Sequence, residues 1–412
     1  MKKILIFLLP VMLLVSCVDQ LVEDGYNIDQ KRATEAPPET LFTNALKNFT
    51  DVMTTPNVNT NNFRLYVQHW ATTTYLQEPR YDLTSRTIPQ ALWQTIYRDV
   101  IADLKESRRL IEADAVLDPS VKANQLASIE VLEVYAWSVL VNTFGDVPYS
   151  EAFIYENPLP KYDDAATIYD DILARLDAAI GQMVTTESGF GDGDLLYSGD
   201  MDQWCKFPKS VKLKLAMVLA DVDAGKGETL VAQAAPNVFT SAADNAAFPY
   251  LDAPPNNNPL SANLNPLYSQ RQDYVMASAL VDEMNDLNDP RRPFYFTDVD
   301  GEYIGGAYGF LNAYPDFSHV SDIVIEPTLE ALLLDYVEVE FLLAEAVERN
   351  FITGTAATHY NNAITASILY WGGTAAEATA YLAQPEVAYA TAGATFEEKI
   401  GTQKWIALYN RG

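Results

Sequence analysis

Residues 328–371 carry the clearest pattern of apolar and polar positions in the chain. Apolar side chains recur there with the period of an α-helix and share one broad side. They are Leu332, Leu333, Tyr336, Val337, Val339, Phe341, Leu343, Ala344 and Val347. After a break at Asn350–Gly354, Tyr360, Ile364, Ile368 and Trp371 predict a second amphipathic helix. The segment therefore predicts a helical hairpin, most of which is buried.

The polar positions of the first helix refine this prediction. Asp335, Glu338, Glu345 and Arg349 fall on the remaining narrow strip, which indicates that they face water. Glu340 instead projects into the apolar side. Because a buried carboxylate needs a donor, we expect Glu340 to have a structural hydrogen-bond partner rather than a catalytic role.

Helical patterns recur along the rest of the chain. They cover residues 41–52, 63–70, 92–104, 126–143, 168–180 and 204–219. Taken in order, these helices form pairs, and the third pair joins 168–180 to 204–219. Together with the 328–371 hairpin, the chain has about four pairs. Small residues such as Ala344, Gly354 and Ala357 resemble those at the close helix contacts of a tetratricopeptide repeat. The sequence therefore predicts a mostly all-α fold, in which tetratricopeptide-like hairpins stack to bury shared faces.

A long irregular stretch separates the third and fourth pairs. It is rich in Asn, Pro and Tyr, as in 254–259 and 305–315, and holds one short predicted helix at Val275–Leu287. A loop of this length inside a compact domain usually has a function. We therefore expect the long loops to carry the binding surface.

The N-terminus has the features of an export signal. Lys2 and Lys3 precede an apolar run that is too short to span a bilayer as a helix, and this run ends in Leu14-Val15-Ser16-Cys17. These residues resemble a bacterial lipobox, in which the cysteine is acylated, for example with palmitate, and anchors the mature protein to a membrane. We therefore expect a signal peptide at 1–16, a lipidated tether at 17–38 and a single domain at 39–412.

Charge limits the choice of ligand. The 27 basic and 56 acidic residues give a net charge of −29, which excludes nucleic acid as a partner and disfavours an anionic substrate.

Catalytic and metal-binding motifs are absent from the sequence. His69, His319 and His359 lack the neighbours of a zinc site, and the chain has no nucleophile elbow or phosphate-binding loop. Asp192 with Asp194, and Asp298 with Asp300, suggest calcium ligands, but neither set completes an EF-hand loop and solvated turns are favoured. We therefore predict no cofactor, no metal site and no enzymatic activity. A glycoside hydrolase that uses an unrecognised pair of carboxylates stays the alternative.

Aromatic residues are the positive signal for a ligand. The chain has 24 Tyr, 17 Phe and 6 Trp, and a sugar ring needs a flat apolar surface beside a few planar hydrogen-bonding groups. Aromatics on the predicted helices are expected in the core. Tyrosines in loops, among Pro, Gly, Asn and Arg, have less core to fill, and Arg80 lies directly before one of them, Tyr81. The predicted ligand-binding residues are Tyr75, Arg80, Tyr81, Tyr268 and Tyr308.

Several short sequence segments together resemble segments of the SusD/RagB family of nutrient-binding lipoproteins. They are Phe144-Gly145-Asp146-Val147-Pro148-Tyr149, Asp289-Pro290-Arg291, the hairpin at 328–371, Tyr381-Leu382-Ala383-Gln384-Pro385, Glu398-Lys399-Ile400 and Gln403-Lys404-Trp405-Ile406-Ala407-Leu408. They occur in the family's order and follow the lipobox. Family chains usually continue beyond the last of these segments, whereas this one stops at Gly412, so the domain is expected to be truncated at its C-terminal end.

The resemblance implies a tetratricopeptide-like lipoprotein that is anchored in the outer membrane and faces outward. Such a protein captures oligosaccharides, or sometimes peptides, and passes them to a SusC-like TonB-dependent transporter. No family motif fixes individual ligand-binding positions in this chain.

Overall fold

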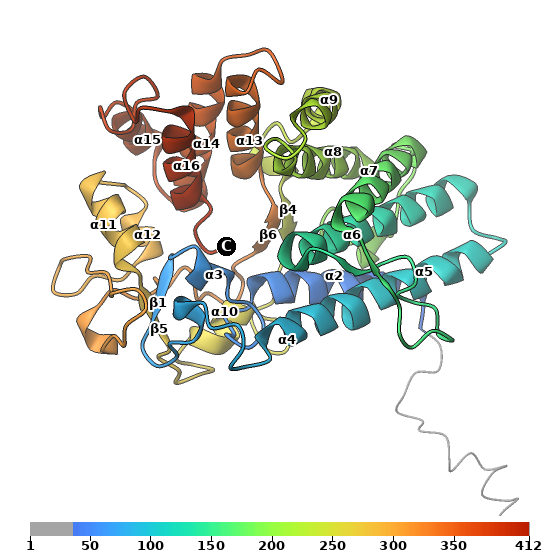
Figure 1. The fold of residues 1–412 in the computed structure, drawn as a ribbon, viewed down its shortest axis with the longest axis horizontal. Helices are drawn as coiled ribbons and strands as arrows, with labels where there is room; N and C mark the ends of the chain where they lie inside the picture. Colours follow the sequence, from blue (N-terminus) through green and yellow to red (C-terminus); the bar gives the residue numbers. More distant parts are fainter. Residues whose placement is uncertain (1–35, 412) are drawn as a thin grey trace, which may run out of the picture. The chain divides into compact units, whose positions relative to one another are not determined.

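The computed structural model describes residues 36–411, so the predicted signal peptide and Cys17 lie outside the described residues. Residues 38–412 group into one unit, and most of its elements are helices (Figure 1). The α-helices are α2 (Pro38–Thr54), α3 (Phe63–Tyr66), α4 (Ile88–Gln94), α5 (Ala102–Ala113), α6 (Pro119–Phe144), α7 (Ala165–Gln182), α8 (Met201–Val218), α9 (Ala224–Ala234), α10 (Pro259–Leu264), α11 (Ser278–Asp286), α12 (Arg292–Tyr295), α13 (Tyr336–Glu348), α14 (Ala356–Tyr370), α15 (Ala375–Leu382) and α16 (Phe396–Ala407). A π-helical turn, Thr95–Ile101, joins α4 to α5.

Aspartate side chains cap the N-termini of several long helices. Each accepts hydrogen bonds from backbone N–H groups of the first turn, and its charge complements the positive end of the helix dipole. These caps are Asp118 of α6, Asp164 of α7, Asp200 of α8, Asp223 of α9 and Asp335 of α13. Part of the acidic excess of the chain therefore stabilises its helices.

Stacked helical hairpins build the scaffold. Helix α6 packs along α7, α8 along α9 and α13 along α14, while α2 packs along α5 and the π-helical turn. This arrangement confirms the predicted all-α, tetratricopeptide-like fold. The expected pairing of 168–180 with 204–219 is wrong, because α7 packs mainly on α6. The short strands β2 (Val147–Pro148) and β3 (Tyr162–Asp163) pair and fold the chain back, so that α7 returns along the preceding helix.

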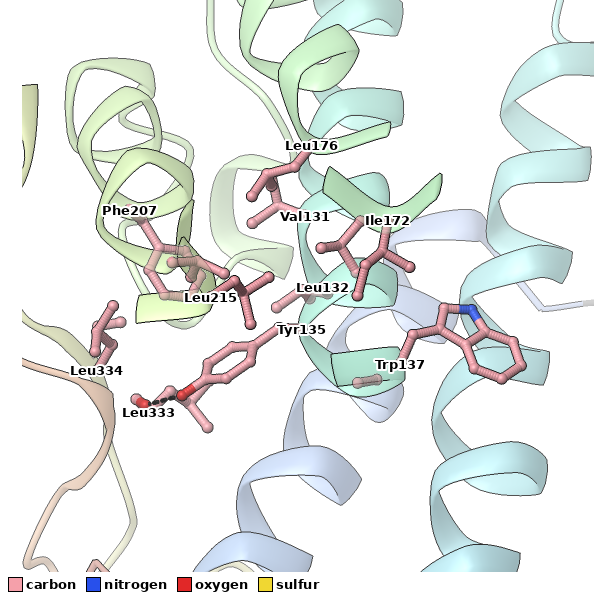
Figure 2. Packing of buried hydrophobic residues seen from close by; sticks show 14 of the residues in the cluster. Val131, Leu132, Tyr135, Trp137, Ile172, Leu176, Phe207, Leu215, Leu333 and Leu334 are labelled. Carbon is pink, nitrogen blue, oxygen red and sulfur yellow. Dashed lines mark hydrogen bonds between the residues drawn. The ribbon is translucent and has the colours of Figure 1, made fainter. Parts of the chain in front are cut away.

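Helix α6 runs through the larger of the two main hydrophobic cores. Its apolar side chains meet α7, α8 and the strand β6 (Ala331–Leu334), as Figure 2 shows. Tyr135 is buried among them and donates its hydroxyl hydrogen bond to the Leu333 carbonyl (Figure 2). The buried Tyr135 hydroxyl therefore has a hydrogen-bond partner in the backbone of β6.

The 328–371 hairpin lies partly in the second core. Phe341 is fully buried there and packs edge to face on Tyr360, with ring centroids 6.3 Å apart, which confirms the predicted apolar side. Buried Glu340 lies 2.8 Å from His359 Nδ1 and 3.3 Å from Asn362 Nδ2. The expected structural partner of Glu340 is confirmed.

Two details of this hairpin differ from the prediction. Leu332 and Leu333 belong to β6, which pairs with β4 (Ala246–Phe248), because a short run of leucines fits a strand as well as a helix. Asp335 and Glu338 are buried rather than solvated. Asp335 caps α13, and Glu338 forms an ion pair of 3.0 Å with Lys214 of α8.

The helix predicted across residues 63–70 is wrong beyond its first turn. Helix α3 ends at Tyr66, and Gln68 has a left-handed φ of 59° that an α-helix does not accommodate. The chain then enters the strand β1 (Trp70–Thr72).

Strand β1 pairs antiparallel with β5 (Tyr274–Met276) in the central loop, with Trp70 opposite Met276. The helix expected at Val275–Leu287 consequently starts later, as α11. This pairing joins the early chain to the central chain about 200 residues away in sequence. It thereby positions the candidate site.

Candidate functional site

Two irregular segments meet where β1 and β5 pair. The Thr73 N–H donates to the Asp273 carbonyl at 2.9 Å, and the Asn312 amide donates to the Thr72 carbonyl at 3.0 Å. The loop that follows β1 therefore lies beside both the 264–276 segment and the 304–312 segment. These segments contain the tyrosines that the sequence predicts as ligand contacts.

Tyr66, Tyr81 and Tyr308 form an aromatic cluster at this junction. The Tyr66 and Tyr81 rings stack with centroids 5.7 Å apart and planes at 28°, and the Tyr308 ring lies 6.4 Å from Tyr81. Tyr81 keeps 54 % of its surface exposed, while the two other tyrosines are partly buried. The cluster therefore presents one supported aromatic ring to solvent.

The turn that carries Tyr81 is held in place by its neighbours. Tyr81 itself has a left-handed φ of 57°, a strained conformation for a residue with a Cβ. The Arg80 Nε donates to the Gly309 carbonyl at 2.9 Å, and Gly309, at a φ of +76°, packs against Pro79 and Arg80. The positive φ of Gly309, which residues with a Cβ rarely adopt, thus shapes the loop around Tyr308 where it meets the Tyr81 turn.

Asp82 closes the other side of this turn. Its carboxylate accepts hydrogen bonds from the Ser85 and Thr84 backbone N–H groups, each at 3.1 Å. The hydrogen bonds from Ser85 and Thr84 favour the charged form and lower the pKa of Asp82 to about 2. Asp82 is therefore ionised above pH 4 and acts as a loop cap.

Tyr75 lies between two guanidinium groups. Arg86 sits over its ring, 5.2 Å from the centroid, and Arg271 Nη2 lies 3.4 Å from its hydroxyl. Arg86 forms an ion pair with buried Glu78, and Arg271 pairs with Asp273 at 2.5 Å. The positive charges beside Tyr75 are thus offset by carboxylates.

The structure brings together some of the predicted site residues and leaves one apart. The Tyr81 and Tyr308 rings lie side by side, and Arg80 contacts Gly309, the residue after Tyr308. Tyr75 is linked to the same turn through Arg86, which pairs with Glu78. Tyr268 is 38 % exposed and donates to the Asp252 carbonyl at 3.2 Å. It forms none of the aromatic pairs found within residues 36–411, so it lies outside the cluster.

Two aromatic residues at the site were missed by the sequence prediction. Tyr66 falls in the segment read as a core helix, yet its ring supports Tyr81. The Asn-rich stretch 57–62 just before α3 is the signal that this segment is irregular. Phe310 is largely exposed beside Gly309, and its loop setting is the same signal that predicted Tyr308.

Two of the four aspartates considered as calcium ligands, Asp194 and Asp298, have structural roles. Asp298 accepts from the Gly301 N–H in a turn, and buried Asp194 accepts from the Trp204 indole and the Gly199 N–H. Within the described range 36–411, no three His, Cys, Asp or Glu side chains gather as a metal site would require.

Sequence and structure comparisons place this chain among known proteins. A family model described as SusD-like, "starch-binding associating with outer membrane", matches residues 30–412. The chain belongs to this SusD-like family. No curated protein sequence matches it.

Solved structures share the SusD-like fold. A chitin-binding protein is 26 % identical, with a TM-score of 0.77 over 91 % of this chain and 84 % of that one. A SusD homolog from Bacteroides fragilis is 23 % identical, with a TM-score of 0.74 over 91 % and 85 % of the two chains. A chitin-binding SusD homolog from Flavobacterium johnsoniae is 22 % identical, with a TM-score of 0.73 over 90 % and 83 %.

The Asp289-Pro290-Arg291 segment of this SusD-like chain forms a buried polar network. Arg291 Nε and Nη2 donate to both oxygens of the Asp289 carboxylate at 2.9 and 2.5 Å, and both side chains are fully buried. Arg291 also donates to Ser367 of α14 and to Gln403 of α16. Burial alone would lower the pKa of Arg291, but the Asp289 carboxylate raises it above its ordinary value.

Proposed function

We propose that this SusD-like chain is an outer-membrane lipoprotein that binds glycans and passes them to a SusC-like TonB-dependent transporter. The observation that carries the proposal is the exposed Tyr81 ring, which Tyr66 and Tyr308 support on a fixed turn. A family model that describes starch binding at the outer membrane supports it, as does the structural similarity to a chitin-binding protein.

The geometry suits a sugar ring. The C–H face of a sugar stacks on the Tyr81 ring, while the Arg80 guanidinium beside it has N–H groups for adjacent hydroxyls. Tyr75 and Tyr308 extend the same surface. Tyr268 stays a predicted contact at a separate position.

Hydrolysis is the alternative that the carboxylates leave open. Near the aromatic cluster, Glu78 pairs with Arg86, Asp82 caps a turn and Asp273 pairs with Arg271. A glycosidase needs two carboxyl groups directed at the scissile bond, so these acids favour binding without cleavage. Incubation with oligosaccharides distinguishes the two functions, since shortened products would reveal a hydrolase.

The aromatic cluster gives a direct binding prediction. We expect Tyr81→Ala and Arg80→Ala each to weaken glycan binding by about 1–2 kcal/mol, because each removes a ring contact or a hydrogen-bond donor. Calorimetric titration measures this loss, with a polysaccharide that the parent protein retains. Tyr155→Ala is the matched control, because Tyr155 is 96 % exposed on the loop between α6 and α7 and takes no part in the ring contacts of the aromatic cluster. Equal affinity in all three variants would place the glycan site elsewhere.

Membrane attachment is proposed to depend on the Cys17 thiol. Among the helices of residues 36–411, none is both long and apolar enough to cross a bilayer. Cys17 lies outside the described residues, and its proposed role rests on the lipobox sequence. We expect Cys17→Ala to move the folded protein from the membrane fraction to the soluble fraction or to leave it uncleaved. Lipid labelling that persists in Cys17→Ala would contradict this anchor.

A further inference from the structure

A wide surface depression lies next to the turn that carries the aromatic cluster. Its volume is about 550 Å³, and its lining includes Asn59, Ser85, Arg86, Thr87, Gln90 and Gln94. We call it the polar groove. Gln90 and Gln94 are four residues apart on α4 and share one face of that helix, and both side chains are exposed.

The polar groove continues toward the central loop. A smaller hollow of about 60 Å³ shares Asn59 with it and extends to Asn263 and Arg271. A third hollow shares Arg271 and reaches Tyr314 and His319. The two smaller hollows therefore adjoin the polar groove in turn through Asn59 and Arg271, while the polar groove itself has by far the largest volume of the three.

Arg86 connects the polar groove to the aromatic cluster. It lines the polar groove, covers the Tyr75 ring at 5.2 Å and pairs with Glu78 in the turn that precedes Tyr81. Arg271 contacts the same tyrosine from the second hollow. A ligand stacked on Tyr81 therefore has the polar groove as its nearest extension along the segment 75–86.

The chemistry of the groove indicates a neutral ligand. Arg86 and Arg271 are each offset by a carboxylate, so neither is free to attract an anion. The remaining polar groups, including Gln90, Gln94 and Asn59, are amides and hydroxyls that donate and accept hydrogen bonds. Such groups match the hydroxyls of uncharged sugars.

We infer that the polar groove binds the continuation of a glycan whose first sugar stacks on Tyr81, so that the protein selects neutral chains of several sugars. This inference rests on the proposed glycan-binding function and adds the length and charge class of the glycan. A depression of about 550 Å³ falls within the size range that holds a ligand of several rings.

The test compares short and long oligosaccharides from one polysaccharide. Electrophoresis in gels containing starch, xylan, galactomannan or a soluble chitin derivative first identifies a neutral glycan that retains the protein, with polygalacturonate as the acidic counterpart. Titration then compares its trimer and its hexamer. We expect the parent protein to bind the hexamer about tenfold more tightly. In Gln90→Ala/Gln94→Ala, we expect the hexamer to bind about five- to tenfold more weakly and the trimer to be unaffected.

Two variants separate the possible results. Gln182→Ala, at the exposed end of α7, is the matched control and should bind both oligosaccharides as the parent does. Tyr81→Ala should weaken both the trimer and the hexamer. If the parent binds trimer and hexamer equally, or if Gln90→Ala/Gln94→Ala keeps parental affinity for the hexamer, the groove is not part of the site while the proposed function stands. Retention by polygalacturonate alone overturns the neutral class, and retention by no glycan overturns the proposed function itself.

Discussion

Replacing Arg291 with methionine is expected to lower the free energy of unfolding by about 3–5 kcal/mol. The substitution leaves the Asp289 carboxylate buried without its counter-charge, and it also removes the hydrogen bonds to Ser367 and Gln403. Because these bonds join the Asp-Pro-Arg turn to α14 and α16, the loss should affect the whole second core. Denaturant unfolding followed by circular dichroism measures it.

A second substitution tests whether the unpaired charge is the cause. Asp289→Asn in the Arg291→Met background removes the buried charge and should recover more than about 1 kcal/mol. Arg98→Met is the matched control, since exposed Arg98 pairs only with its neighbour Asp99 and should cost less than about 0.5 kcal/mol. Arg291→Met with unchanged stability would mean that the ion pair contributes little to holding these helices.

Replacing His69 with glutamine is expected to make the protein more resistant to acid. His69 is buried between Trp405 and Tyr409, and its Nε2 donates to the Trp405 carbonyl at 3.0 Å. Burial, together with the positive charges of Arg64 and Arg411, lowers its pKa from 6.5 to about 3. Between these two values the unfolded chain binds a proton that the folded chain does not. His69 therefore costs about 1.4 kcal/mol of stability for each pH unit below 6.5.

Unfolding curves at several pH values measure this effect. The difference in the pH-dependent free energy of unfolding between His69→Gln and the parent should grow by about 3 kcal/mol as the pH falls from 6.5 to 4. Glutamine does not titrate, and its amide can keep the hydrogen bond to Trp405. His319→Gln is the control. Because His319 is only half-buried, its replacement should change the pH dependence of the free energy of unfolding less than His69→Gln does. Parallel profiles for the parent and His69→Gln would show that His69 is protonated in the folded state.

Helical periodicity predicted the scaffold because the period of apolar residues is a local property. It placed Phe341 in the core and required a partner for Glu340, and both predictions are confirmed. It misread Leu332 and Leu333, because the strand β6 that contains them depends on pairing with β4, about 85 residues earlier. Asp335 and Glu338 looked solvated because their partners lie on their own backbone turn and on α8.

For the candidate site, the sequence predicted which two loops carry it but not the groove beside them. Tyr81 and Tyr308 stand out among turn residues, and β1 pairing with β5 brings their segments together. Gln90 and Gln94 gave no signal, because a polar helix face that lines a depression has the same pattern as one that faces bulk water. Grooves depend on neighbouring segments, which the local pattern does not contain.

The supports of α3 have a consequence for the order of folding. Arg64 donates to Asn410, and Trp405 Nε1 donates to the Val67 carbonyl, so the C-terminal end of the described chain lies against α3 (Figure 1). Contacts separated by more than 300 residues close very large loops and form late in folding. During synthesis from the N-terminus, α3 can therefore form these hydrogen bonds only after α16 and the residues that follow it have been made. The proposed glycan-binding face, which α3 helps to build, should therefore form last, after the stacked hairpins are already compact.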